Sequence, residues 1–229
     1  MADGCGGQHT GEGAGMVFES LKTRQREIRE SFPPDFALRI HRAISWAGRA
    51  EREADDPDAA FVFWWVAFNA AYANDLGEGE ARSEFKDFFA RLHALDHDGR
   101  LYNAVWTTFS GRIRVFLENP YVYSPFWKHH NGNPDYADWS DRFRRAKRVF
   151  HAGLVGKDTA LILSMLFDRL YVLRNQILHG GATWNSRVNR DQIHDAAAIL
   201  GTMVPIMLDL MMDNPHKDWG RPFYPVVEA

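Results

Sequence analysis

The residues best suited to chemistry in this chain lie at the end of one apolar stretch, LFDRLYVLRNQILHGGATW, residues 166–184. Arg174, Asn175 and His179 interrupt a run of Leu, Ile, Val and Phe just before a pair of glycines. An arginine neutralises phosphate charge, a histidine moves protons, and an amide orients either group. The three residue types together suit phosphoryl chemistry, which raises the hypothesis of an active site at a helix end.

A helix places Asn175 and His179 on the same face, because they are four residues apart. Arg174 and His179 are five residues apart, roughly 140° around the helix, so they do not share a face. In the last turn, the carbonyl end of the helix dipole favours a protonated imidazole at His179. The long side chain of Arg174 therefore has to swing toward the face that carries the other two groups.

Spacing alone is weak support for this hypothesis, because the chain contains 21 Arg and 10 His. Other places with comparable spacing are Arg91 with His97, Arg144 or Arg145 with His151, and Arg187 with His194. Residues 174–179 differ in context, since they end an apolar helix and Gly-Gly follows the His directly. The alternative interpretation is a partly exposed Arg and a His that caps the helix C-terminus, where basic residues are common.

The elements that must position these residues are all predicted to be helices. Pro34 is suited to begin one helix, and Asp56 with Pro57 to cap and begin the next, which is apolar nearly all round and should be buried. Further helices are expected over 17–31, 79–99, 100–119, 141–154, 157–179 and 189–214. No stretch alternates with period two for long enough to predict a strand. The predicted fold class is therefore all-α, a bundle of about six to eight helices with one longer loop.

Composition divides the chain into two tails and one domain. Residues 1–16 are Gly-rich and are predicted to be a flexible tail, and residues 215–229 are predicted to be a C-terminal tail. Residues 17–214 between them form a single predicted helical domain. Within it, residues 119–140 are rich in Pro, Asn, Gly and aromatics and have no sustained period, so they are predicted to be an inserted loop.

Composition, net charge and cysteine count exclude several classes of protein. Apolar residues make up 45% of the 229 residues, which indicates a packed core rather than disorder. The net charge of −3 means that nucleic acid can be bound only by a local basic patch. Cys5 is the one cysteine, so the sequence allows no intrachain disulfide and favours a reducing compartment. The N-terminus has no apolar signal region and the apolar runs are short, so we expect a cytoplasmic protein without membrane contact.

A second candidate surface is the basic segment RFRRAKR, residues 142–148. Its cations are suited to gripping an RNA backbone. They are Arg142, Arg144, Arg145, Lys147 and Arg148. The alternative is a solvated helix face, which such charge runs commonly form.

A metal site is not predicted. His129 and His130, with Asp135 and Asp138 nearby, are the candidates, but adjacent histidines do not share a helix face. We therefore expect chemistry that needs neither a metal nor another cofactor.

Two blocks of the sequence resemble the Apea-like branch of the HEPN domain family. LYVLRNQILHGGAT resembles its signature helix, in which an Arg is followed by a polar residue and, a few residues later, by a His. Residues 41–75 resemble its upstream helices, with a Trp near an RA pair, an acidic patch and then FxxxWxAFNAxY. The two blocks occur in the expected order, and the resemblance covers residues 39–214.

The resemblance implies a helical bundle that dimerises, with the signature helices forming a composite cleft at the interface. Many such domains are metal-independent ribonucleases in toxin–antitoxin, anti-phage and RNA-processing systems. The family's Arg, polar residue and His fall on Arg174, Asn175 and His179. The implied reaction is attack of a ribose 2′-hydroxyl on the adjacent phosphate, which leaves a 2′,3′-cyclic phosphate and a 5′-hydroxyl.

Other members of the family are non-catalytic nucleotide-binding or assembly modules, and this alternative stays open. The expected partners are RNA, a second copy of the chain, and an antitoxin or effector protein. The interpretations differ in exposure: a ribonuclease needs Arg174 and His179 open to one cleft. A purely structural helix would bury Arg174 in an ion pair, for example with Asp168 or Asp191.

Overall fold

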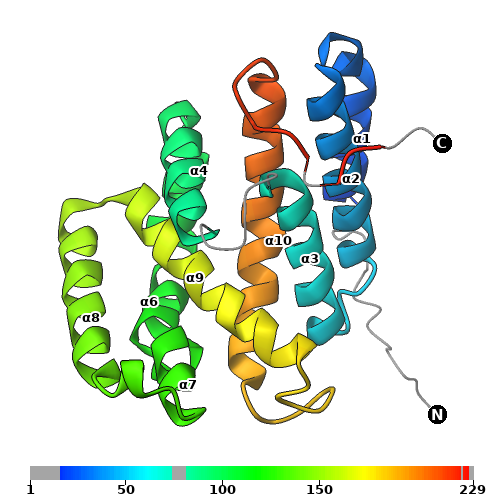
Figure 1. Ribbon diagram of the computed structural model, residues 1–229. Coiled ribbons are helices and arrows are strands. Elements are labelled where there is room, and N and C mark those ends of the chain that lie inside the picture. The colour runs from blue at the N-terminus through cyan, green and yellow to red at the C-terminus, as the bar shows by residue number, and fades with distance from the viewer. Residues whose placement is uncertain (1–15, 74–80, 223, 227–229) are drawn as a thin grey trace, which may run out of the picture.

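The computed structural model describes residues 16–73, 81–222 and 224–226, which form ten α-helices and no strand (Figure 1). The all-α prediction is confirmed. The helices are α1 Met16–Ile28, α2 Pro34–Glu51, α3 Pro57–Tyr72, α4 Ala81–Leu95, α5 Arg100–Asn103, α6 Ser110–Glu118, α7 Ser124–His130, α8 Trp139–Gly156, α9 Thr159–Leu178 and α10 Arg190–Asp213. The predicted tail 1–16 lies outside the described residues, except for Met16 at the start of α1.

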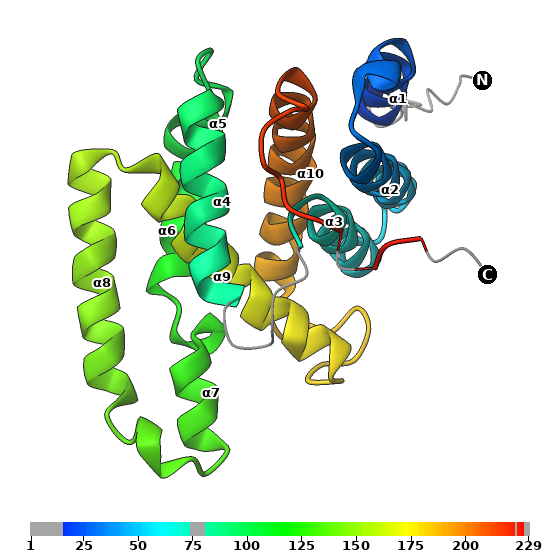
Figure 2. The ribbon, with the colours of Figure 1, turned by 45° about the horizontal axis from the view of Figure 1, so that its top comes forward.

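One half of the molecule is built from α1, α2, α3 and α10, which pack side by side (Figures 1 and 2). α2 begins at Pro34 as predicted, because proline fixes the first helical turn without needing a hydrogen-bond partner. Its apolar face is buried, from Phe36 through Ile40, Ala43 and Ile44 to Ala47. This face packs on α3, and α1 covers the outer side of α2.

α3 is buried or half-buried along its whole length, as the sequence predicted. The Asp56 carboxylate accepts hydrogen bonds from the backbone N–H groups of Asp58 and Ala59, both at 3.1 Å, and caps the helix. Aromatic side chains join α3 to the other half of the molecule. The ring of Phe68 lies 4.5 Å from that of Phe167 on α9, between ring centroids. Burial of such large rings supplies much of the free energy that holds the two halves together.

The other half contains α4, α6 and α8, which pack around α9, with α8 at the edge farthest from α1 (Figure 2). The prediction of one helix over 100–119 is wrong. A π-helical turn, Ala104–Thr108, separates α5 from α6. Its wider winding turns the indole of Trp106 toward α9, where Trp106 Nε1 donates to Thr159 Oγ1 at 2.8 Å. Thr159 is fully buried, so this contact satisfies its hydroxyl.

The prediction of a loop over 119–140 is also wrong. This segment holds α7 and two 3-10 turns, Pro120–Val122 and Pro134–Tyr136. The asparagine before each 3-10 turn accepts a hydrogen bond from the backbone N–H of the second residue of that turn. Each of the three pieces has proline in its first turn, and each is too short to show a helical period in the sequence.

α10 runs the length of the molecule and is largely buried (Figure 1). By length and composition alone, this helix is apolar enough to cross a membrane. However, 61% of its most apolar 18-residue window is buried inside the fold, as a core helix requires. Beyond α10, the described part of the predicted C-terminal tail packs on the bundle, since Trp219 is buried against Phe88 on α4.

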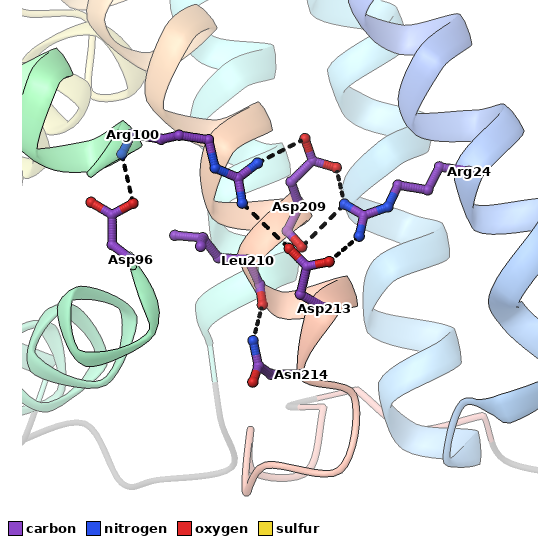
Figure 3. Close-up of polar contacts among 7 residues, drawn as sticks. All are labelled: Arg24, Asp96, Arg100, Asp209, Leu210, Asp213 and Asn214. Carbon is purple, nitrogen blue, oxygen red and sulfur yellow. Dashed lines mark hydrogen bonds and ion pairs between the residues drawn. The ribbon is translucent and has the colours of Figure 1, made fainter. Parts of the chain in front are cut away.

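Four charged side chains tie α1 and α5 to the C-terminal end of α10 (Figure 3). We call Arg24, Arg100, Asp209 and Asp213 the charged cluster. Arg24 donates to Asp209 at 2.6 Å and also pairs with Asp213, while Arg100 lies 3.5 Å and 3.3 Å from the same two carboxylates. Partial burial acts to lower the pKa of Arg24, but its hydrogen bonds with both carboxylates outweigh that effect and raise it. Every charge in the cluster therefore faces opposite charge.

Candidate functional site

Arg174, Asn175 and His179 occupy the last turns of α9, as predicted. Arg174 and Asn175 are half-buried, whereas His179 is exposed and is the C-cap residue. Arg174 Nη1 donates a hydrogen bond to Asn175 Oδ1 at 2.8 Å. The guanidinium carbon of Arg174 also lies 5.7 Å from the ring centroid of Tyr171. The side chain of Arg174 is therefore held at the surface of its own helix.

Arg174 does not form the ion pair expected of it in a purely structural helix. Within the described residues no carboxylate lies within 4.0 Å of its guanidinium, and neither Asp168 nor Asp191 is paired with it. Its Nε atom is buried without a hydrogen-bond partner in the same set of residues. An amide orients Arg174 without neutralising it, so the positive charge remains available to an anion.

Two glycines end α9 for different physical reasons. Gly180 has a φ of +70°, a left-handed conformation that side chains disfavour. Gly181 N donates to Gln176 O at 2.7 Å, and a Cβ at Gly181 would lie 2.9 Å from that same oxygen. Together they end the helix at Leu178, and the N–H of the C-cap residue His179 still donates to Asn175 O at 3.0 Å. The helix end thus fixes the backbone of the candidate proton-transfer residue.

A cavity of about 580 Å³ lies beside this helix end. α9 contributes Tyr171, Val172, Asn175 and Gln176 to its wall. The segment around α7 contributes Tyr121, Ser124, Trp127, Lys128 and Asn131, and the turn before α10 contributes Gly181, Val188 and Asn189. Of the three motif residues, only Asn175 lines the cavity. Within one chain, Arg174 and His179 are therefore not brought together with Asn175 in this cavity.

Gln176 connects the three parts of the cavity wall, and sequence reasoning did not single it out. Its Nε2 donates to Tyr121 O at 2.6 Å, and its Oε1 accepts from Asn189 Nδ2 at 2.9 Å. Trp127 Nε1 donates to the same carbonyl of Tyr121 at 2.7 Å. Segments more than fifty positions apart are thus joined by one amide, a link that no local pattern could have indicated.

The turn between α9 and α10 is anchored to the start of α3. Trp184 Nε1 donates to Asp56 Oδ2 at 2.9 Å, and Arg190 pairs with Asp58 at 2.7 Å. Desolvation acts to raise the pKa of Asp56, but the N–H groups of Ala59, Trp184 and Asp58 and the charge of Arg190 hold it below its usual value. The carboxylate that caps α3 therefore also positions the loop that follows His179.

The basic segment lies on α8, as predicted, but most of its charge is paired. Arg142 and Arg145 both contact Asp138, at 2.6 Å and 3.4 Å, and Arg144 pairs with Asp141. Among the described residues, the ion pairs of this segment involve neither Lys147 nor Arg148. The candidate RNA-binding surface therefore reduces to a smaller set of uncompensated cations than the sequence alone indicated.

The two histidines considered for a metal make other contacts. His130 Nδ1 lies 2.8 Å from the carbonyl oxygen of Phe126, and its ring stacks on that of Phe126 with 4.0 Å between centroids. His129 meets His130 edge to face. The part of the chain that the structure describes contains no group of three or more His, Cys, Asp or Glu side chains suited to hold a metal ion.

No family model, no curated protein and no solved structure matches this chain. Its function is therefore inferred from the geometry of the α9 end and from the residues of the motif itself.

Proposed function

We propose that this protein is a metal-independent endoribonuclease of the HEPN type that acts as a homodimer in the cytoplasm, in a defence or toxin-like role. The observation that carries the proposal is the state of Arg174. Its guanidinium is half-buried, is oriented by Asn175, has no carboxylate partner among the described residues, and lies on the same helix end as the exposed His179. An oriented but uncompensated arginine suits stabilisation of the charge on a phosphorane.

In the proposed reaction, His179 as general base accepts the proton of a ribose 2′-hydroxyl. The 2′-oxygen forms a bond to the adjacent phosphorus, and the bond from phosphorus to the 5′-oxygen breaks. A protonated His179 from the second copy donates a proton to the leaving 5′-oxygen, which gives a 2′,3′-cyclic phosphate and a 5′-hydroxyl.

A second copy of the chain solves a geometric difficulty of the single helix. Arg174 and His179 diverge by roughly 140° around α9, so a facing copy is needed to place both at one phosphate. Apolar side chains around the helix end support an interface there, because Leu178, Trp184 and Val188 are all more than half exposed. Large apolar side chains left in water beside a functional group favour association.

The test is an RNA cleavage assay in EDTA that compares the wild-type protein with Arg174→Ala and His179→Ala. His97→Ala is the matched control, since His97 is exposed and follows Arg91 with a comparable spacing. We expect cleavage products with cyclic phosphate ends from the wild type and the control only. Cleavage that survives in both Arg174→Ala and His179→Ala contradicts the proposal.

A second candidate is a non-catalytic module that binds a nucleotide and an antitoxin or effector protein. It is favoured by one observation: the cavity is lined by Asn175 but by neither Arg174 nor His179. If this candidate is right, the wild type cleaves no more than His179→Ala on several RNAs, while it still binds nucleotides.

A further inference from the structure

The cavity between α7 and α9 has walls of exposed aromatic rings. Tyr121 is 55% exposed, Tyr171 40% and Trp127 38%. Phe126 contacts two of them edge to face, with ring centroids 5.3 Å from Tyr121 and 5.2 Å from Trp127, and so restrains their orientation. Restrained aromatic rings that remain open to solvent in a cavity suit the stacking of another flat ring.

Two side-chain amides that line the cavity each use only one of their two polar atoms in a hydrogen bond within the described residues. Asn175 uses its Oδ1 to hold Arg174, and Asn189 uses its Nδ2 to hold Gln176. Among the described residues, the Nδ2 donor of Asn175 and the Oδ1 acceptor of Asn189 have no partner. One free donor and one free acceptor match the edge of a nucleobase, which presents groups of both kinds side by side.

The charge of the cavity favours an anionic ligand. None of its lining side chains is acidic, and Lys128 contributes a cation. The Lys128 ammonium donates to the Tyr136 hydroxyl at 2.9 Å and lies 4.7 Å from the centroid of that ring. These contacts orient the ammonium without neutralising it, which leaves it able to contact a phosphate.

We propose that this cavity binds one nucleotide of an RNA chain, with its base stacked on the aromatic wall and its phosphate near Lys128. Asn175 and Asn189 then bond to the edge of the base and set which base is accepted. The inference rests on the proposed function, because it names the substrate contact beside the same helix end. The cavity volume of about 580 Å³ falls within the range of small-ligand sites.

The test is calorimetric titration of the full chain with each of the four nucleoside 5′-monophosphates. We expect saturable binding that differs among the four bases, and a loss of about tenfold or more in Tyr121→Ala, from the removal of one stacking contact. Tyr121→Ala removes the ring but keeps the backbone carbonyl that holds Gln176 and Trp127. The matched control is Tyr224→Ala, since Tyr224 is 73% exposed and its carbonyl likewise accepts a side-chain hydrogen bond.

A second variant separates base recognition from phosphate recognition. Lys128→Met should weaken binding of the monophosphates and leave binding of the corresponding nucleosides unchanged. Inorganic phosphate alone should compete poorly, because it offers nothing to the aromatic wall. Competition by phosphate as strong as that by the monophosphates would overturn the assignment of a base site.

The outcomes also separate this inference from the ribonuclease proposal, since a mononucleotide contains no internucleotide bond to cleave. Binding that Tyr121→Ala weakens, in a protein that cleaves no RNA, supports the nucleotide site and removes the ribonuclease. RNA cleavage in a protein that binds none of the four monophosphates, or equal binding by Tyr121→Ala and Tyr224→Ala, overturns the nucleotide site and leaves the ribonuclease standing.

Discussion

The C-terminal ends of the two long helices α9 and α10 use arginine in opposite ways. At the C-terminal end of α10, Arg24 and Arg100 each contact the same two carboxylates, and the charged cluster joins three helices (Figure 3). At the C-terminal end of α9, Arg174 contacts an amide and the face of Tyr171 instead. Cations that face carboxylates hold the fold together, whereas an oriented cation without one keeps its charge for a ligand.

Arg39 shows a third way in which this fold uses an arginine, as a buried side chain. Its side chain is 1% exposed and donates to the backbone carbonyls of Ala71, Ala73 and Gly220. Burial lowers the pKa of Arg39 to about 10. Arg39 is thus enclosed, and its Nη atoms donate to backbone carbonyls, whereas Arg174 is half exposed. It is the combination of access, orientation and missing countercharge that distinguishes the α9 end.

Among the substitutions that test this comparison, replacement of Arg174 should have the largest effect, and that effect is on catalysis. Arg174→Ala should reduce RNA cleavage by about a hundredfold or more, as loss of transition-state charge stabilisation does, with little change in thermal stability. Arg100→Ala should do the reverse, lowering stability and leaving cleavage unchanged. Cleavage rate and thermal unfolding are measured on both variants, to check that one loses only activity and the other only stability. If Arg100→Ala also abolished cleavage in a folded protein, the two ends would not be independent.

The next effect is on the charged cluster itself. Asp209→Asn should lower the free energy of unfolding by about 1–2 kcal/mol, a value discounted because Asp209 is 30% exposed. In urea unfolding, the difference in stability between the wild type and Asp209→Asn should be smaller at 1 M salt than at low salt, because salt screens the ion pairs of the charged cluster. Asp141→Asn is the control, since its pair with Arg144 is far more exposed and should contribute little. Equal effects of the two substitutions would contradict a structural role for the cluster.

A smaller effect tests the contact that anchors the turn after α9 to the start of α3. Asp56→Ala should cost about 1 kcal/mol of stability, because it removes the N-cap of α3 and the partner of Trp184. The folded pKa of Asp56 is depressed, so its contribution is present above the unfolded pKa and is lost as pH falls through the folded value. The difference in unfolding free energy between the wild type and Asp56→Ala should therefore shrink on acidification. A difference that stays constant from neutral pH to about pH 2 would contradict this linkage.

The smallest expected effect is on the basic face of α8. Arg148→Ala should reduce the slope of log affinity for single-stranded RNA against log salt by about 0.7, the value for one lost phosphate contact. Arg144→Ala should change it less, because Asp141 already neutralises that arginine. Filter binding over a range of salt concentrations measures both slopes. A larger change in Arg144→Ala would show that pairing in the free protein does not predict which cations meet RNA.

Local rules accounted for much of the fold. Asp56 and Pro57 open α3, Pro34 opens α2, and the glycine pair ends α9, each through an interaction within a few residues along the chain. The same rules also operate at 119–140, where Asn119 before Pro120 and Asn133 before Pro134 start turns, although the segment has little helical periodicity. The signal was present, but each helical piece is shorter than the window in which a period can be seen.

The candidate site was predictable only in part. Arg174, Asn175 and His179 stood out because polar residues interrupted an apolar helix. The cavity could not be predicted from the sequence, because its walls come from Tyr121 and Lys128 on one side and Gln176 and Asn189 on the other. Which side chains meet across such distances depends on packing, and the π-helical turn before α6 illustrates how little the sequence shows of it.

Gln176 also determines how the wall of the cavity opens. Because a single side chain bonds both the carbonyl of Tyr121 and the amide of Asn189, neither segment can separate from α9 without disturbing the other. Their backbone amides should consequently exchange with deuterium as one cooperative unit, although they lie in different parts of the chain. A ligand that fills the cavity would slow exchange in both segments at once, and Gln176→Ala would uncouple them.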